Sequence, residues 1–312
     1  MMRFPPWAVA VAVGFSISSS AATAAECDRA CLSGFLDTYL AALKAHDVAA
    51  LPVTRNVKYT ENGVRLNLGD GLWQTVSAAP DHRITVIDDE AGQVGLLGII
   101  GENGNRNFFA TRLKVEKGEK ISEIENLVVR NISGGGMGNT KETKASPIFD
   151  ETIPGNKRLT RAELAAIGNS YFTGLDTENS GENVPFSDQC QRRENGSITA
   201  NDPNAEDGSM QRRGCKEQFD TGFSVIVTDI RERRFEVVDR VKGLAFGWGY
   251  FDHNGSVEKF SRTPDHELVD VDPTFRQPFS FYIAEIFKIE DGKIRQIEAA
   301  LTTVPFEMES GW

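Results

Sequence analysis

The chain has 312 residues, 40% of them hydrophobic, and its 45 acidic and 34 basic residues give a net charge of −11. A surface of this sign repels phosphate backbones, so we expect no nucleic-acid partner. The length and the apolar fraction are sufficient for two cores of ordinary size.

The first 25 residues have the features of a secretory signal peptide. Arg3 precedes an apolar stretch over 4–15, and a tail of small residues ends before Glu26. Glu26 stands where a lipoprotein signal needs a small residue, so no lipid is expected on Cys27. No later segment reaches the roughly 20 apolar residues of a membrane span. The sequence therefore predicts an exported protein, periplasmic or extracellular, without a membrane partner.

The next part of the chain predicts a helix followed by strands. Apolar residues over 30–46 recur at the spacing of one helical face. Short β-rich runs separated by turns then follow, at 83–87, 93–100, 105–115 and 121–129. Residues 133–158 are rich in glycine, polar and without a period, which is typical of a linker.

The same order of elements returns after the linker. A helix begins at Leu159, where Thr160 and Glu163 form a capping box. Strands are predicted at 234–238, 243–251, 279–289 and 293–304. An insertion over 253–277 has no counterpart in the first half, and we interpret it as a lid at the rim of a pocket.

The two halves are copies of each other. Residues 107–130 align with 280–304, and residues 51–63 align with 184–196. A repeat of this length indicates duplication of a small domain, because the units of solenoids and propellers are shorter. We therefore predict an α+β protein with a first unit over 26–132 and a second unit over 159–312, each a helix region followed by a curved antiparallel sheet.

The four cysteines are predicted to form two disulfides. Cys190 and Cys215 bracket a polar loop, whose closure would contribute roughly 3 kcal/mol. Cys27 and Cys31 pair by elimination, although four residues is a short separation for disulfide geometry. Cysteine pairs without nearby histidines favour disulfides over a metal, and no metal site is predicted.

The helix and meander of each unit resemble the NTF2-like superfamily, the α+β cone of SnoaL-like polyketide cyclases, ketosteroid isomerases and scytalone dehydratases. The pieces ENG, GDGLW, GCKEQFDTGF, GYFDHNG and VPFEMESGW are similar to a largely uncharacterised group of secreted tandem proteins of fungi and bacteria. The superfamily resemblance implies a pocket for a compact apolar or aromatic molecule and proton transfer without metal or organic cofactor. It also includes members that only bind or dimerise, so a homo-oligomer is a further expectation.

His253 is the first candidate for catalysis. It follows Asp252 at the end of an apolar strand, and we hypothesise that it acts as general acid or base while Asp252 or a nearby carboxylate sets its tautomer. The alternatives are that His253 caps a turn in DHNG or that it binds a metal. His266, in an acidic stretch of the insertion, is interpreted as part of a solvated surface loop.

Glu285 is the second candidate. Strand alternation places it on the face that carries Phe281, Ile283, Phe287 and Ile289. A carboxylate on an apolar face needs a partner or has a raised pKa, and both are common in acid–base catalysis. An ion pair with an arginine such as Arg234 is the alternative.

Aromatic residues complete the predicted site. Tyr250 would supply a catalytic hydroxyl, and packing in the core or at the rim is the alternative for the tyrosines. The predicted contacts with the substrate are Tyr171, Phe219, Trp248 and Tyr282.

The first unit is expected to be mainly structural. Its polar and aromatic candidates are His46, Tyr59, Trp73 and Arg112. His46 ends a helix, where a cation is favourable. Trp73 is expected to plug the first cone or to pack between the copies.

The chain lacks the motifs of serine hydrolases, nucleotide enzymes and zinc proteases. The sequence therefore favours a cofactor-free lyase, dehydratase or isomerase that acts on a small apolar or aromatic molecule in the second unit. The alternative is a secreted binding or interaction module without catalysis.

Overall fold

The structure is a computed structural model that describes residues 1, 27–130, 138–140, 144–263 and 266–312. Apart from Met1, the predicted signal peptide lies outside the described residues, as do part of the linker and two positions of the predicted lid.

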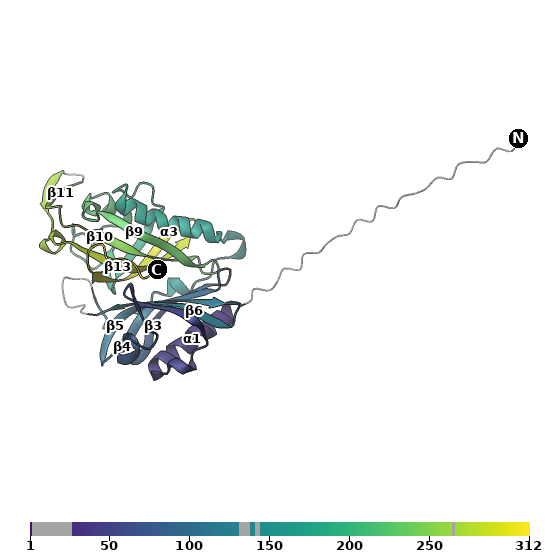
Figure 1. Ribbon diagram of the computed structural model, residues 1–312. Coiled ribbons are helices and arrows are strands. Elements are labelled where there is room, and N and C mark those ends of the chain that lie inside the picture. Colours follow the sequence, from purple (N-terminus) through teal and green to yellow (C-terminus); the bar gives the residue numbers. More distant parts are fainter. Residues whose placement is uncertain (2–26, 131–137, 141–143, 264–265) are drawn as a thin grey trace.

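The first unit begins with a helix and continues as a sheet (Figure 1). Its elements are α1 (Arg29–Ala45), η1 (Val48–Ala50), β1 (Val53–Glu61), β2 (Val64–Leu66), α2 (Leu72–Thr75), β3 (Val76–Asp88), β4 (Gln93–Glu102), β5 (Asn105–Glu116) and β6 (Lys120–Val129). Asp28 caps α1 by accepting a hydrogen bond from the backbone of Cys31, and His46 ends the helix in the left-handed conformation. His46 therefore has a structural role.

The second unit repeats this plan with additions. Two short 3₁₀ helices, η2 (Pro147–Asp150) and η3 (Gly155–Lys157), precede it. Its elements are α3 (Arg161–Asp176), β7 (Phe186–Glu194), β8 (Ser197–Ala200), α4 (Cys215–Phe219), η4 (Phe223–Ile226), β9 (Asp229–Asp239), β10 (Leu244–His253), β11 (Lys259–Arg262), β12 (Glu267–Asp270), η5 (Pro273–Arg276), β13 (Phe279–Glu290) and β14 (Lys293–Val304). The capping box predicted at Thr160 and Glu163 is present at the start of α3.

Each unit contains a six-stranded sheet, and the strand order is the same in both: β2-β1-β6-β5-β4-β3 and β8-β7-β14-β13-β10-β9. The pairs β1–β6 and β7–β14 are parallel, and the other pairs within these sheets are antiparallel. This shared order confirms the predicted α+β class and shows the duplication in the structure.

The ENG motif has the same role in both copies. Asn62 accepts a hydrogen bond from the backbone of Val128 and donates one back to it, and Asn195 forms the same two bonds with Leu301. Both asparagines have positive φ, which asparagine tolerates better than most residues. The motif therefore fixes the turn after the first strand against the last strand of each sheet.

The two sheets lie against each other, with α1 and α3 on the outside (Figure 1). The concave face of each sheet packs on its own helix and forms one core. A third core lies between the sheets, with residues such as Leu97 and Phe108 from the first sheet and Phe246 and Trp248 from the second. Phe149, in the predicted linker, is buried in this third core. The third core therefore holds the two units together, while the other two cores stabilise each unit separately.

Reciprocal ion pairs join the units at the helix starts. Arg29 at the start of α1 binds Asp239 of the second unit at 2.7 Å, and Arg161 at the start of α3 binds Asp88 of the first unit at 2.8 Å. Each aspartate also accepts a backbone hydrogen bond from the opposite sheet, from Ile87 or from Val238. The contact between the units is therefore pseudo-symmetric.

Both predicted disulfides are present. Cys27 and Cys31 have Cα atoms 5.3 Å apart, and Cys190 and Cys215 have Cα atoms 5.8 Å apart. The second disulfide joins β7 to α4 and closes the polar loop between them. Disulfides indicate an oxidising environment.

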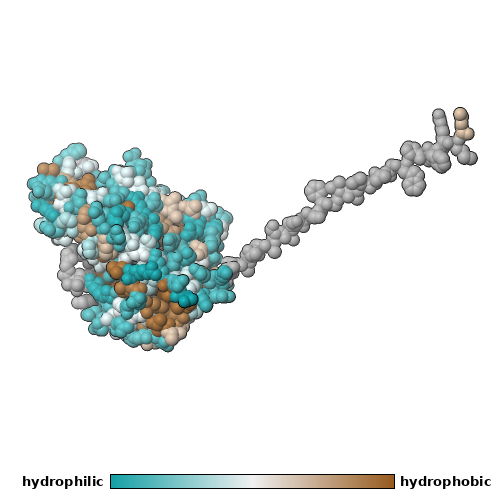
Figure 2. All heavy atoms as spheres, viewed as in Figure 1, coloured by the Kyte–Doolittle hydropathy of each residue, from teal (hydrophilic) through white to brown (hydrophobic). Residues whose placement is uncertain are grey.

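The surface view in Figure 2 shows a mainly hydrophilic face with smaller hydrophobic areas. None of the helices in the described parts of the chain has the length and apolar character to cross a membrane.

Candidate functional site

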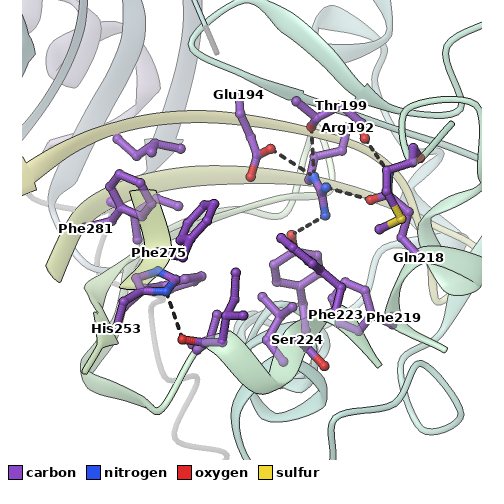
Figure 3. A pocket seen from close by; sticks show the side chains of 18 of the residues that line it. Arg192, Glu194, Thr199, Gln218, Phe219, Phe223, Ser224, His253, Phe275 and Phe281 are labelled. Carbon is purple, nitrogen blue, oxygen red and sulfur yellow. Dashed lines mark hydrogen bonds and ion pairs between the residues drawn. The ribbon is translucent and has the colours of Figure 1, made fainter. Parts of the chain in front are cut away.

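A cavity of about 280 Å³ opens inside the second cone, between the sheet, α3, α4 and η4 (Figure 3). Most of its lining is apolar, and polar side chains are concentrated on one side. The lining residues are Tyr171, Leu175, Arg192, Glu194, Thr199, Met210, Gln211, Gln218, Phe219, Phe223, Ser224, Ile226, Val227, Phe251, His253, Phe275, Phe281, Ile283 and Leu301.

Arg192 organises the polar side of the cavity. Its guanidinium group donates hydrogen bonds to the hydroxyls of Thr199 (3.0 Å) and Tyr171 (3.1 Å) and to the side-chain oxygen of Gln218 (2.7 Å). Glu194, two residues along β7, lies 3.5 Å from Nε of Arg192. The cavity therefore presents a fixed cation and a carboxylate on the same side, as Figure 3 shows.

Glu285 lies on the inner face of the same sheet, on the predicted side of its strand. In the sheet register, Ala299 stands between Glu285 and Glu194. Glu285 is fully buried, and neither carboxyl oxygen has a hydrogen-bond partner among the described residues. It does not line the cavity itself but lies beside the polar residues that do.

The protonation of Glu285 follows from this position. Burial, together with the neighbouring charge of Glu194, raises the pKa of Glu285 to about 8, although the charge of Arg192 and the nearby Tyr171 hydroxyl oppose the shift. At neutral pH the group is therefore a neutral carboxylic acid. The predicted alternative, an ion pair between Glu285 and Arg234, is wrong, because Arg234 binds Glu125 on the opposite face of the sheet, between the two units.

His253 lies on the other side of the cavity. Its Nδ1 atom is 2.9 Å from the backbone oxygen of Ile226, and its ring stacks on Phe279 with 4.6 Å between ring centroids. Burial lowers the pKa of His253 to about 4, despite the opposing effects of the Ile226 carbonyl and Asp252. The imidazole is therefore neutral at physiological pH and poorly suited to act as a base there.

Asp252 does not orient His253. Successive strand residues point to opposite faces, so Asp252 faces away from the cavity. There it binds Arg231 and accepts a hydrogen bond from Ser280 at 2.5 Å. The predicted Asp252–His253 pair is therefore wrong, and Asp252 is part of an ion pair outside the cavity.

Three further predicted site residues lie between the two sheets. Tyr250, Trp248 and Tyr282 are fully buried in the third core, and none of them lines the cavity. The physical reason is again strand alternation, which puts Tyr282 and Glu285 on opposite faces of β13. The structure therefore removes these residues from the cavity, whereas Tyr171 and Phe219 line it as predicted.

The predicted lid contributes little to the cavity wall. Within it, β11 and β12 pair, and Phe260 and Val271 pack with Ile226 in a small separate core. Among the described residues of the insertion after His253, Phe275 lines the cavity. A second wall, with Met210 and Gln211, comes from the loop that Cys190 and Cys215 bracket, and sequence reasoning did not predict it.

Arg192 and Glu194 were also missed, because β7 is polar and shows no alternation, and so was Gln218 on the short helix α4. The alignment of the two copies contained a signal that could have identified the two β7 residues. The alignment over 184–196 pairs Arg192 with Tyr59 and Glu194 with Glu61, so a charged residue replaces an aromatic one at the same inward position.

The equivalent space in the first cone is filled. Trp73 is buried against Tyr39, with 5.9 Å between ring centroids. The Tyr39 hydroxyl bonds Asn126, and Asn126 accepts a hydrogen bond from Thr111 at 2.8 Å. Trp73 therefore plugs the first cone, which was one of its two predicted positions.

A larger groove, of about 800 Å³, lies on the first unit, but its main charges are paired. Arg130 binds Glu61 at 2.8 Å and Glu102 at 2.7 Å. Among the described residues, this groove therefore offers no unpaired buried acid or base comparable to Glu285. In the described residues, no group of three or more histidine, cysteine, aspartate or glutamate side chains is placed to hold a metal ion.

The repeated organisation matches a known family. A family described as "Domain of unknown function (DUF8021)" matches residues 25–128 and 157–301, one stretch in each unit. The chain belongs to this family. A search of curated proteins found no match.

Solved structures with similarity to parts of the chain also lack an assigned function. An NTF2-like protein of unknown function from Cytophaga hutchinsonii is 13% identical, with a TM-score of 0.26, over 31% of this chain and 88% of that one. A protein of unknown function with a cystatin-like fold, from Methylobium petroleophilum, is 14% identical, with a TM-score of 0.29, over 38% of this chain and 99% of that one.

Proposed function

We propose that the second unit is a cofactor-independent acid–base enzyme, a lyase, dehydratase or isomerase, that acts on a compact and mainly aromatic molecule. The observation that carries this proposal is Glu285, a buried carboxylic acid without a hydrogen-bond partner, beside a pocket that also contains Glu194. Neighbouring carboxyl groups whose environments give them different protonation states are a common feature of acid–base sites.

The residues have distinct roles in this proposal. Glu194 lines the cavity, accepts a proton from a carbon next to the substrate's carbonyl, and returns it to another carbon in an isomerisation or to the leaving hydroxyl, as water, in a dehydration. Arg192 and the Tyr171 hydroxyl stabilise the negative charge that then develops on a carbonyl or hydroxyl oxygen. Glu285 is a positioning residue. As a neutral acid it lies beside Glu194 and Arg192 without adding a second negative charge to this side of the cavity.

The apolar lining supports an aromatic substrate. Phe219, Phe223, Phe251, Phe275 and Phe281 line the cavity. Rings of this kind stack on aromatic ligands and exclude water, which strengthens the electrostatic interactions on the polar side.

A binding module without catalysis is the second candidate, and two observations favour it. Glu285 does not line the cavity, and Arg192 is already bonded to three side chains. Such a site could hold a ligand without transferring a proton.

The test is product analysis by mass spectrometry. The protein would be incubated with a panel of aromatic ketones and hydroxyketones, beside Glu194→Gln, Glu285→Gln and a control, Glu182→Gln, which changes an exposed carboxylate. We expect turnover to be lost in Glu194→Gln, reduced in Glu285→Gln and unchanged in the control. Ligand-induced thermal stabilisation without turnover in any of them would favour the binding module.

We also propose that the protein is exported. Its disulfides and the signal-peptide features of residues 1–25 support this proposal.

A further inference from the structure

The side of the cavity opposite Arg192 has its own polar atom, on His253. The imidazole is 3% exposed and lies among Phe275, Phe279 and Phe281, with ring centroids between 4.6 and 5.4 Å away. Its position among these rings fixes the plane of the imidazole. A flat ligand in the cavity would therefore meet His253 at a defined angle.

The hydrogen bond to Ile226 determines the tautomer of His253. A backbone carbonyl can only accept, so Nδ1 carries the proton, and the neutral ring leaves a lone pair on Nε2. No described residue bonds Nε2, and this atom is not among the buried polar atoms that the protein encloses without a partner. Because the side chain lines the cavity, Nε2 is available there as a hydrogen-bond acceptor.

The two sides of the cavity therefore have different chemistry. Arg192 and Tyr171 supply donors on one side, whereas the aromatic side offers an acceptor and no cation. A ligand that spans the cavity needs an acceptor at one end and a donor on its aromatic end.

We propose that the ligand of the second unit is a hydroxylated aromatic molecule, whose hydroxyl group donates a hydrogen bond to Nε2 of His253 while a carbonyl group at its other end meets Arg192. His253 is then a residue that determines specificity. This inference takes from the proposed function only that the ligand binds in the cavity of the second unit. It holds for a binding protein as well as for an enzyme.

The test compares 4-hydroxyacetophenone with 4-methylacetophenone by calorimetric titration of the full protein. The methyl group is close to hydroxyl in size but cannot donate, so we expect the hydroxyl compound to bind about five- to tenfold more tightly. His253→Phe keeps a ring and removes the acceptor, so it should abolish this preference and still bind 4-methylacetophenone. His266→Phe, which changes an exposed histidine, should leave the preference intact.

A ¹⁵N spectrum of the wild-type imidazole provides a readout that needs no variant. We expect Nε2 of His253 to be unprotonated and to shift when 4-hydroxyacetophenone is added, but not when the methyl compound is added. Equal affinities, a preference that survives in His253→Phe, a protonated Nε2, or no binding of either compound would overturn the inference. Binding with the predicted preference but without turnover contradicts only the proposed catalysis, and turnover without the preference contradicts only this inference.

Discussion

At the scale of residues, the duplicated chain contains its own comparison. One row across the first sheet is Leu96, Thr111, Asn126 and Glu61, and the corresponding row in the second sheet is Gly247, Glu285, Ala299 and Glu194. In the first row, Thr111 and Asn126 bond each other. In the second row, Ala299 has no polar group to offer, and Glu285 remains without a partner. The same fold therefore holds a satisfied cluster in one copy and a neutral acid in the other.

Glu285 should make the stability of the protein depend on pH. Its pKa is about 8 in the fold and 4.5 ordinarily, so the folded state binds this proton more tightly than the unfolded state. Its favourable contribution is complete below about pH 4.5 and is lost as the pH rises through about 8, by at most about 5 kcal/mol. Urea unfolding should therefore show that raising the pH from 6 to 9 lowers the free energy of unfolding less in Glu285→Gln than in the wild type.

Glu298 provides a matched variant. It is buried between the sheets, 3.8 Å from His82, and burial raises its pKa to about 8 as well. Glu298→Gln should flatten the same pH dependence but leave ligand binding unchanged, because Glu298 points to the opposite face of the sheet and does not line the cavity. A pH dependence that neither substitution alters would contradict the raised pKa values.

Residue-level prediction succeeded where one strand's alternation was followed consistently. Alternation placed Glu285 on the inner face, and the structure has it there. The same rule applied to Tyr282 and Asp252 would have removed both from the cavity. Hydrogen bonds such as that from His253 to Ile226 join distant segments, so the sequence alone did not predict them.

At the scale of elements, two segments distinguish the second unit from the first. The loop between Cys190 and Cys215 supplies one wall of the cavity, and the insertion after β10 supplies Phe275. Both are additions to a strand order that the two units share. The open cavity of the second cone is therefore associated with added segments and with the absence of a plug like Trp73.

Removing the disulfide of this loop should affect both stability and binding. Replacing Cys190 and Cys215 with serine releases a segment with a sequence separation of 25, and we expect a loss of about 3 kcal/mol and weaker ligand binding. Replacing Cys27 and Cys31 opens a loop with a separation of only 4, so its effect on stability should be smaller, and binding should be unchanged. Thermal unfolding and ligand titration of both double variants would check this, and equal effects would count against it.

Element prediction was better for the buried strands than for the edges. The hairpin of β13 and β14 was predicted because both strands are strongly apolar and a turn sequence joins them. No strand was predicted over β1 or β7, where polar residues hide the alternation, and β3 begins before the predicted run. Pro80 lies in the first part of β3, and a proline argues against a strand in the sequence. The strand forms nevertheless because β3 is at the edge of its sheet, where proline is tolerated.

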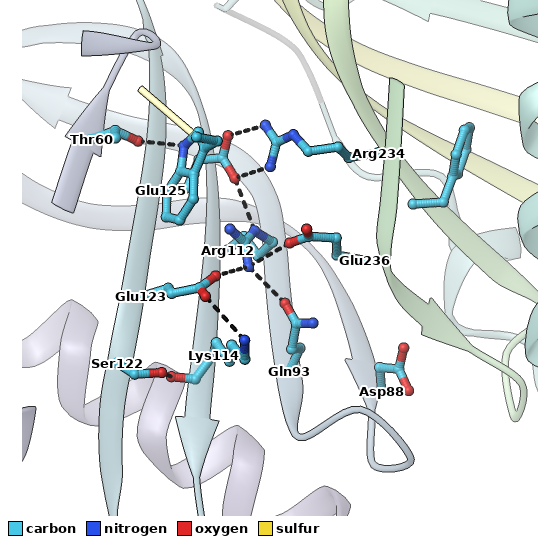
Figure 4. A network of polar contacts seen from close by, with 12 residues as sticks. Thr60, Asp88, Gln93, Arg112, Lys114, Ser122, Glu123, Glu125, Arg234 and Glu236 are labelled. Atoms are coloured by element: carbon cyan, nitrogen blue, oxygen red, sulfur yellow. Dashed lines mark hydrogen bonds and ion pairs between the residues drawn. The ribbon is translucent and has the colours of Figure 1, made fainter. Parts of the chain in front are cut away.

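At the scale of the whole molecule, a buried ion network joins the two sheets (Figure 4). Glu125 of the first unit binds Arg112 at 2.9 Å and Arg234 of the second unit at 2.5 Å, and it accepts a hydrogen bond from Tyr282. The Trp312 ring lies over both arginines. The arrangement neutralises buried charges from both units at one point of the contact between them.

Removing Glu125 should destabilise the whole protein. Glu125→Ala leaves Arg112 buried without its carboxylate partner on that side, and the loss of one member of a buried pair costs about 3–5 kcal/mol. Glu119→Ala, at an exposed position of the first unit, should have little effect. Urea unfolding followed by fluorescence and by circular dichroism would measure both, and a change below about 1 kcal/mol in Glu125→Ala would refute a role for this network in stability.

The contact between the units could be predicted only in part. Residues 244–253 are apolar on both faces, which indicates a strand covered on both sides. The sequence did not show that the second cover is the other copy, because the apolar residues that meet there come from strands far apart in the chain.

A ¹³C NMR titration of the Glu285 carboxyl group, assigned by its absence in Glu285→Gln, would test the acid–base site most directly. We predict that the group stays protonated at pH 7 and titrates near pH 8. We also predict that addition of a bound aromatic ketone changes this titration. A carboxyl group that titrates near its ordinary value of 4.5 and does not respond to ligand would contradict the acid–base site in the second unit.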